Sequence, residues 1–227
     1  MQVLDLHPWD VDYHQAVSIQ NELRGRVQLQ GEPGTIRRVA GADVSFSKAT
    51  NRVYAAVVLY DLERKEAVEV ATASGRSTFP YIPGLLSFRE APILLRAFQN
   101  LRTEPDVVIL DGQGIAHPRR FGLASHIGLL LDLPSIGCAK TKLVGEYQEP
   151  EPERGSASPL LHHGEEIGLV LRTKKGVKPV FVSVGHKISL KRAADVVLAC
   201  CTHFRLPEPT RLAHLLTNRL RTQQEKS

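Results

Sequence analysis

Three strand-like runs lie close together in the early part of the chain, over residues 37–46, 53–61 and 67–74. They are rich in valine and other apolar residues, and the turn-forming residues Thr50-Asn51 and Glu63-Arg64-Lys65 separate them. Gaps this short cannot hold the crossover helix that parallel neighbours need. The three runs therefore predict an antiparallel meander.

The later strands are expected to alternate with helices. Residues 107–110, Val-Val-Ile-Leu, form a continuous apolar run that is typical of a strand buried on both faces of a sheet. A helix of about 15 residues that ends near Arg102 precedes it. Further strands are expected over 135–139, 167–171 and 180–183, and further helices over 119–131, 189–202 and 208–220.

This order of elements predicts an α/β protein. We expect a ribonuclease H-like mixed sheet, in which an antiparallel meander is followed by parallel strands, with helices on both faces. A doubly wound fold is the alternative, although such folds usually begin with a strand, a crossover helix and a parallel strand.

The length of 227 residues fits one domain over residues 1–227, since single cores commonly run to about 250 residues. An N-terminal helix is expected over 8–28, where apolar residues have helical spacing. Residues 148–158, with their prolines and glutamates, predict a surface loop. The tail after about residue 220 is expected to be disordered.

The charge balance indicates a polyanionic partner. Lys and Arg number 29 against 24 Asp and Glu, which gives a net charge of +5. Such an excess attracts nucleic acid, although many basic proteins bind none. No run of about 18 apolar residues is present, so no membrane partner is expected. Cys138, Cys200 and Cys201 are badly placed for a disulfide framework, which indicates buried thiols in a reducing, cytoplasmic compartment.

Two aspartates are candidates for chemistry. Asp43 lies inside the first strand-like run among apolar and small residues, so it would be buried and would need a partner or a metal. The alternative places Asp43 on a solvent-exposed face of that strand. Asp111 ends the buried strand and precedes Gly112-Gln113-Gly114. Strand ends carry the sites of open α/β sheets, although Asp-Gly also begins ordinary turns.

Glu90 has two interpretations. Ser87-Phe88-Arg89-Glu90 matches the Ser-x-x-Glu capping box, so Glu90 could merely begin a helix. From a helix start it could also reach a neighbouring sheet. With Asp43 and Asp111 it would then make an oxygen-rich site for Mg²⁺ or Mn²⁺. Such an ion activates water and steadies the departing oxygen of a phosphodiester.

Lys140 and His117 could complete such a site. Lys140 ends a short strand, where an ammonium could neutralise charge that develops on a phosphate. A strand-terminal lysine is, however, usually just exposed. His117 precedes Pro118 in a loop and could touch the phosphate or orient water. A lone loop histidine is more often structural.

Tyr81 and Ile82 lie between two prolines in Phe79-Pro80-Tyr81-Ile82-Pro83-Gly84. The prolines fix an extended backbone with little entropy left to lose. A rigid aromatic tip can wedge into a base stack and support a flipped nucleotide. The alternative is a loop whose Tyr81 packs on the body of the protein.

Together, four segments resemble the motifs of the endonuclease V family, in the family's order. They are Gly41-Ala42-Asp43-Val44-Ser45, Pro80-Tyr81-Ile82-Pro83-Gly84-Leu85-Leu86-Ser87-Phe88-Arg89-Glu90, Asp111-Gly112-Gln113-Gly114-Ile115-Ala116-His117-Pro118-Arg119 and Gly137-Cys138-Ala139-Lys140. The similarity covers roughly residues 15–220. Cys138 is a small departure, because the family usually has a valine of similar volume there.

The resemblance implies a ribonuclease H-like fold and Mg²⁺-dependent hydrolysis beside deoxyinosine, with Mn²⁺ as a substitute. In the family, the cut falls at the second phosphodiester 3′ of the lesion and leaves 3′-hydroxyl and 5′-phosphate ends. Asp43, Glu90 and Asp111 would be the metal carboxylates, and His117 and Lys140 would act at the scissile phosphate. The implied DNA contacts are Pro80, Tyr81, Ile82, Pro83, Gly84, Arg89, Gly112 and Gly114, with Tyr81 as the wedge and the glycines near the flipped base.

Two histidines, His126 and His214, also stand where the family places histidines, although His126 could simply be packed on a helix face. We therefore expect a monomeric DNA repair endonuclease that acts on DNA containing deaminated bases such as inosine. An inosine-specific ribonuclease is the nearest alternative, because relatives in this family prefer RNA. A non-catalytic lesion-binding module is the second alternative, and the intact carboxylates argue against it.

Overall fold

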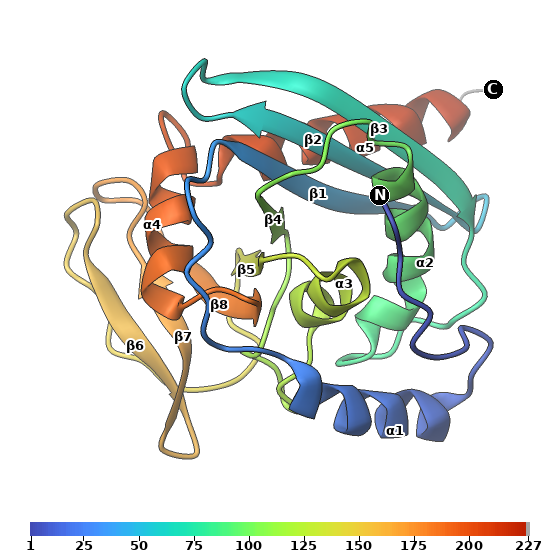
Figure 1. Ribbon diagram of the computed structural model, residues 1–227, viewed down its shortest axis with the longest axis horizontal. Coiled ribbons are helices and arrows are strands. Elements are labelled where there is room, and N and C mark those ends of the chain that lie inside the picture. The colour runs from blue at the N-terminus through green and yellow to red at the C-terminus, as the bar shows by residue number, and fades with distance from the viewer. Residues whose placement is uncertain (226–227) are drawn as a thin grey trace.

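The computed structural model describes residues 1–225 and is organised around one mixed sheet of eight strands (Figure 1). The strands are β1 (Arg38–Ser47), β2 (Arg52–Asp61), β3 (Glu66–Arg76), β4 (Val107–Leu110), β5 (Ser135–Ala139), β6 (Ala157–His162), β7 (Glu165–Leu171) and β8 (Val180–His186). The helices are α1 (Tyr13–Leu23), α2 (Leu86–Gln99), α3 (Leu123–Leu131), α4 (Leu190–Cys200) and α5 (Glu208–Glu225), with a 3₁₀ turn at Arg24–Arg26.

The strand order is β3-β2-β1-β4-β5-β8-β7-β6. The strands β1, β2 and β3 form the expected antiparallel meander, and β4 and β5 continue the sheet in parallel with β1. The predicted α/β class and ribonuclease H-like mixed sheet are confirmed. After β5, the strands β8, β7 and β6 are antiparallel again.

Helices cover both faces of the sheet, as expected (Figure 1). On β4, Val108 and Leu110 belong to the core under α2 and α3, whereas Val107 and Ile109 belong to the core under α4. All four side chains are fully buried, which explains the continuous apolar run of this strand. Helix α5 lies along β1 and β2 on the α4 side, where Ala213 packs against β2.

Strand β6 was not predicted, because residues 148–158 have the composition of a surface loop. The loop ends at Ser156, and Ala157 and Ser158 already belong to β6. Pro159 lies in this strand, opposite Leu169. The position is tolerated because β6 is the edge of the sheet, where a missing N–H costs no interior hydrogen bond.

The N-terminal helix is shorter than the expected span of 8–28. Asp12 and Gln15 form a reciprocal capping box that fixes the start of α1 at Tyr13. The residues before it pass in an extended conformation along α3, where the N–H of Leu4 donates to the carbonyl oxygen of Leu130 at 2.8 Å. The interpretation of residues 8–12 and 27–28 as helical is therefore wrong.

Two other helix boundaries also differ from the prediction. Helix α3 begins at Leu123 rather than 119, because a turn closed by the N–H of Arg120 and the carbonyl oxygen of His117 comes first, and Arg120 has a φ of 58°. Helix α5 continues to Glu225, so residues 221–225 are helical rather than a disordered tail, and residues 226–227 lie outside the described residues. None of the helices within residues 1–225 is long and apolar enough to cross a membrane.

Candidate active site

Asp43 and Asp111 lie side by side where β4 ends. The parallel register pairs Ala42 with Leu110, and the aspartates are the next residues of the two strands. The N–H of Asp111 donates to the carbonyl oxygen of Ala42 at 3.4 Å. Because β1 continues to Ser47 while β4 stops, the two carboxylates open into a pocket that they line together with Glu90, Lys140 and His214. We call this the carboxylate pocket.

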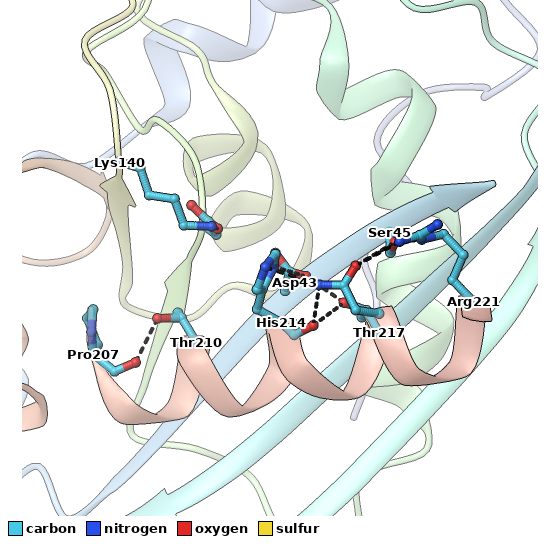
Figure 2. Close-up of polar contacts among 10 residues, drawn as sticks. Asp43, Ser45, Lys140, Pro207, Thr210, His214, Thr217 and Arg221 are labelled. Atoms are coloured by element: carbon cyan, nitrogen blue, oxygen red, sulfur yellow. Dashed lines mark hydrogen bonds and ion pairs between the residues drawn. The ribbon is translucent and has the colours of Figure 1, made fainter. Parts of the chain in front are cut away.

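Asp43 is held from the opposite side by α5 (Figure 2). Its Oδ2 accepts a hydrogen bond from the hydroxyl of Thr217 at 2.7 Å and lies 3.2 Å from Nδ1 of His214. On the other side of the ring, Nε2 of His214 lies 3.1 Å from the amide nitrogen of Asn218. Asp43 is therefore buried and paired, and the alternative of a solvent-exposed strand face is wrong.

Burial is the main cause that raises the pKa of the Asp43 carboxyl. The hydrogen bond from Thr217 opposes this rise, and the nearby charge of Asp111 adds to it. Thr217 itself was missed by the sequence reasoning. The sequence could have indicated Thr217, because it lies three residues after His214 and so shares one face of a helix with it.

Asp43, Asp111 and His214 fit a divalent cation. Each offers one ligand atom, and these atoms lie within 4.8 Å of one another. Two carboxylates at this separation repel each other, so a cation between them would be stabilising. The two carboxylates supply the oxygen ligands that Mg²⁺ or Mn²⁺ prefers. His214 thus joins the two predicted aspartates, and Glu90, the third predicted metal carboxylate, lines the same pocket.

Glu90 projects from α2 into the same pocket. The capping-box interpretation is wrong, because α2 begins at Leu86 without a side-chain cap and the hydroxyl of Ser87 instead lies 3.1 Å from Nδ1 of His126. Burial raises the pKa of Glu90 to about 8, and the charge of Asp43 adds to the rise. Within residues 1–225, no hydrogen bond or ion pair neutralises this carboxylate.

Lys140 directly follows β5, the strand beside β4, and its ammonium pairs with the carboxylate of Asp111. The Lys140 side chain is 35% exposed and faces the carboxylate pocket. The alternative of a merely exposed lysine is therefore wrong. The pairing places a positive charge at the mouth of the pocket, where a phosphate could approach it.

A second pocket, of about 360 Å³, adjoins the first. We call it the loop pocket, because its lining comes from the Pro-bounded loop, the Asp111 loop and the segment after β5. Leu86, Asp111, Leu123 and Lys140 line both pockets and form their shared wall. A ligand in the loop pocket would therefore lie beside Asp111 and Lys140, which also line the carboxylate pocket.

Tyr81 stands at the rim of the loop pocket. Its side chain is 68% exposed, so the alternative in which it packs on the body of the protein is wrong. The neighbouring Ile82 is half-buried against Phe79, and the N–H of Leu85 donates to the carbonyl oxygen of Ile82 at 2.9 Å. Pro83 lines the pocket beside it, and Pro80 does not. The loop thus presents Tyr81 outward from an anchored base.

The anchor of this loop is the carbonyl oxygen of Gly84, which accepts three hydrogen bonds. They come from Nε2 of Gln20 at 3.0 Å, Nε2 of His117 at 2.9 Å and Nη2 of Arg119 at 2.7 Å. Gly84 has a φ of +78°, which favours glycine. No signal in the sequence linked Gln20 to this loop, because the contact joins residues that are 64 positions apart.

His117 has both ring nitrogens engaged by backbone groups. Nδ1 accepts from the N–H of Arg119 at 3.1 Å, so Nε2 carries the proton that is donated to Gly84. Burial lowers the pKa of His117 to about 4, which keeps the ring neutral. In this structure His117 helps to hold the loop, and its expected role at the phosphate stays a prediction.

Gly112 and Gly114, the other two glycines expected near the base, differ in whether they line the loop pocket. Gly112 lines the loop pocket, and a Cβ there would only touch Leu123 at 3.6 Å. Gly114 does not line it. A Cβ at Gly114 would lie 2.0 Å from the carbonyl oxygen of Val184, so this glycine is required for packing against β8. The expectation that Gly114 approaches the base stays a prediction.

Arg89 and His126 lie away from both pockets. The Arg89 guanidinium stacks over the ring of Phe46, 3.9 Å from its centre, at the end of β1. His126 is fully buried, and its Nε2 lies 2.7 Å from Nε2 of His7. Burial lowers the pKa of His126 well below its usual value. His126 is a packed core histidine, whereas His214 belongs to the site.

Comparison with known proteins agrees with this geometry. The family model of endonuclease V matches residues 21–215. Endonuclease V from Methanothrix thermoacetophila is 52% identical over 217 residues, which are 96% of each chain. The crystal structure of endonuclease V from Streptomyces avermitilis matches 100% of both chains with a TM-score of 0.92 and 44% identity.

A structure of Ciona intestinalis endonuclease V in complex with a 24mer DNA containing an inosine followed by a ribo-adenosine also matches. Its TM-score is 0.82 and its identity 29%, over 92% of this chain and 97% of that one. The fold, the order of the four motifs and the identity over nearly the whole chain lead to one conclusion. The chain belongs to the endonuclease V family.

Proposed function

We propose that this protein, a nuclease by its family, is a DNA repair enzyme that hydrolyses the second phosphodiester 3′ to deoxyinosine. The products would carry 3′-hydroxyl and 5′-phosphate ends. The observation that carries the proposal is the shared wall of the two pockets. A base flipped into the loop pocket would bring a phosphate of its own strand to the carboxylates. The Ciona intestinalis relative bound to inosine-containing DNA supports this ligand.

Asp43, Asp111 and His214 would hold Mg²⁺, with Mn²⁺ as a substitute, and Glu90 would complete the site from α2. The bound ion would supply activation of water and neutralisation of the departing oxygen. Thr217 fixes the Asp43 carboxylate, which orients it for a cation. Lys140 would stabilise the negative charge that grows on the phosphate.

Recognition of the lesion would come from the loop pocket. Tyr81 would enter the base stack in the place that the flipped base leaves, supported by the anchored Gly84. Hypoxanthine lacks the exocyclic amine of guanine, so a pocket shaped to its edge would exclude guanine. All of these groups come from one chain, which supports action as a monomer.

The test is nicking of matched strands. Labelled duplex DNA with one inosine, and RNA of the same sequence, would be incubated with Mg²⁺, with Mn²⁺ and with EDTA. We expect one nick at the second linkage 3′ of inosine in DNA that disappears with EDTA. Cutting of RNA alone would replace the proposal with an inosine-specific ribonuclease, and binding without any nick would replace it with a lesion-binding module.

A further inference from the structure

A row of polar side chains continues from the carboxylate pocket along α5. His214, Asn218 and Arg221 follow one another at spacings of four and three residues, so they share one face of the helix. On β1, Asp43 and Ser45 are two residues apart and share one face of the strand. The two rows meet side by side, with His214 against Asp43 and Arg221 against Ser45 (Figure 2).

The end of β1 lies open beside this row. The strand β4 pairs with β1 only as far as Ala42, and β1 runs on to Ser47. In the part of the chain that the structure describes, no strand pairs with this edge of β1 beyond Ala42. A nucleic-acid strand that leaves the carboxylate pocket therefore has a path along the β1 extension that no other strand blocks.

The Arg221 guanidinium is held in place at this path. Its Nε donates to the hydroxyl of Ser45 at 2.9 Å, and Nη2 lies 3.4 Å from Oδ1 of Asn218. Glu225 lies 3.3 Å from Nη1 and neutralises part of the charge. A guanidinium has five N–H donors, and these contacts use three of them. The side chain is 30% exposed, so the other donors can reach a ligand.

Asn218 links this guanidinium to the carboxylate pocket. Its amide oxygen faces Arg221, and its amide nitrogen lies 3.1 Å from Nε2 of His214. On the other face of β1, the Arg89 guanidinium over Phe46 adds a second positive charge to the same strand end. Arginine is well suited to phosphate, because its planar fork can bind two oxygens at once.

We infer that Arg221, with Ser45 and Asn218, forms a subsite for a backbone phosphate of the nucleic-acid strand on the 3′ side of the cut. This inference rests on the proposed function, which places the base 5′ of the scissile phosphate. The loop pocket, the carboxylate pocket and Arg221 then follow the strand in that order. Arg221 lies about 10 Å along α5 from His214, which corresponds to within about three linkages beyond the cut.

The experiment maps this phosphate by removing single charges from the ligand. A set of inosine-containing oligonucleotides would each carry one neutral methylphosphonate, moved along the strand one linkage at a time. Equilibrium binding would be measured in EDTA, so that cutting does not interfere. The proteins would be the wild type, Arg221→Ala, Arg221→Gln and the control Arg219→Ala, which removes an exposed arginine of the same helix. Thermal melting would check that each variant folds.

We expect one linkage on the 3′ side at which a methylphosphonate weakens wild-type binding roughly fivefold. Arg221→Ala and Arg221→Gln should weaken binding of the unmodified strand to a similar extent. A methylphosphonate at the sensitive linkage should not weaken the binding of these two variants any further. For both variants, the slope of the logarithm of the binding constant against the logarithm of the salt concentration should become shallower by about one. Arg219→Ala should behave as the wild type.

Two results would overturn the inference. One is an Arg221 variant whose binding equals that of Arg219→Ala for every oligonucleotide. The other is a sensitive linkage that stays the same when Arg221 is removed. Nicking of the unmodified inosine strand by the wild type, measured in parallel with Mg²⁺, reports on the proposed function separately, because the phosphate map does not depend on cutting.

Discussion

The two pockets that share a wall are built from different parts of the fold. The carboxylate pocket takes Asp43 from inside β1, Glu90 from α2 and His214 from α5. The loop pocket is lined mainly by loops, and its key contact is a backbone carbonyl, that of Gly84. The first pocket depends on charged side chains whose pKa values burial shifts, and the second depends on the shape of a tethered loop.

This difference has consequences for substitutions. A single change in the carboxylate pocket removes a charged group that no neighbour replaces, so it should stop the chemistry. A single change at the anchor of the loop pocket leaves two of the three donors to Gly84 in place, so it should weaken recognition by a smaller factor. The following predictions test this contrast, from the largest expected effect to the smallest.

Asp111→Ala should reduce the nicking rate by on the order of 10³-fold or more, because it removes a cation ligand and leaves Lys140 without its partner. Binding of inosine DNA should stay within a few-fold. The measurement is single-turnover nicking beside a binding titration, with Asp195→Ala, an exposed acidic residue of α4, as the control. A rate within tenfold of the wild type would show that the carboxylates do not perform the chemistry.

Thr217→Val should raise the Mg²⁺ concentration needed for half-maximal nicking by about 10- to 100-fold, because valine keeps the volume but cannot donate to Asp43. Thr217→Ser retains the hydroxyl and should restore most of the affinity. The measurement is a Mg²⁺ titration at saturating DNA. Identical titrations for the valine and serine variants would contradict a positioning role for this hydroxyl.

Gln20→Ala should raise KM for inosine DNA roughly 3- to 10-fold and leave kcat unchanged, because one donor to Gly84 and one partner of Arg119 are lost. Asn21→Ala is the matched control, since it removes an exposed amide from the same helix. Steady-state kinetics with varied DNA would separate the two constants. A loss in kcat with KM unchanged would mean that the anchor serves chemistry instead.

Apart from its effect on nicking, Glu90→Gln should change the pH dependence of stability without metal, and this change in stability is the smallest of the effects. Burial raises the pKa of Glu90 in the folded state to about 8, from an ordinary value of 4.5. Between these values the folded state holds more protons than the unfolded state, so the free energy of unfolding falls as pH rises. In Glu90→Gln, the fall of the unfolding free energy with pH should be less steep. The difference should be a fraction of the ~1.4 kcal/mol per pH unit that one additional bound proton contributes.

Urea unfolding in EDTA at several pH values between 5.5 and about 8 would check this prediction. Glu146→Gln, a change at another acidic side chain that lies outside the carboxylate pocket, is the control. Equal pH slopes for the wild type and Glu90→Gln would show that Glu90 is not held in a low-dielectric, repulsive site.

The parts of the fold with regular patterns were predictable. The short gaps between the first strands required an antiparallel meander, and the apolar run of β4 fixed the position of Asp111. Pairing of β1 with β4 then follows from the fold class and brings Asp43 beside Asp111. The wrong helix boundaries arose where local signals competed, as at Ser87, whose hydroxyl contacts His126 and does not cap α2.

The links between distant segments were not predictable from patterns. The anchoring of Gly84 joins α1, the Pro-bounded loop and the Asp111 loop through backbone atoms, which leave no mark in the sequence. The same holds for the buried contact between His7 and His126, which made one family histidine structural. The spacing of side chains in the sequence identified the charged groups, whereas the carbonyl oxygen that each polar group contacts is set by the three-dimensional fold.

The most direct test of the central claim, that the loop pocket chooses where the carboxylate pocket cuts, is to move the lesion. One inosine would be shifted a nucleotide at a time along a fixed duplex, and each nick would be mapped at single-nucleotide resolution. The account predicts that the nick moves in step with inosine and always falls at the second linkage on its 3′ side. A nick that stays at a fixed sequence, or cuts scattered along the strand, would contradict it.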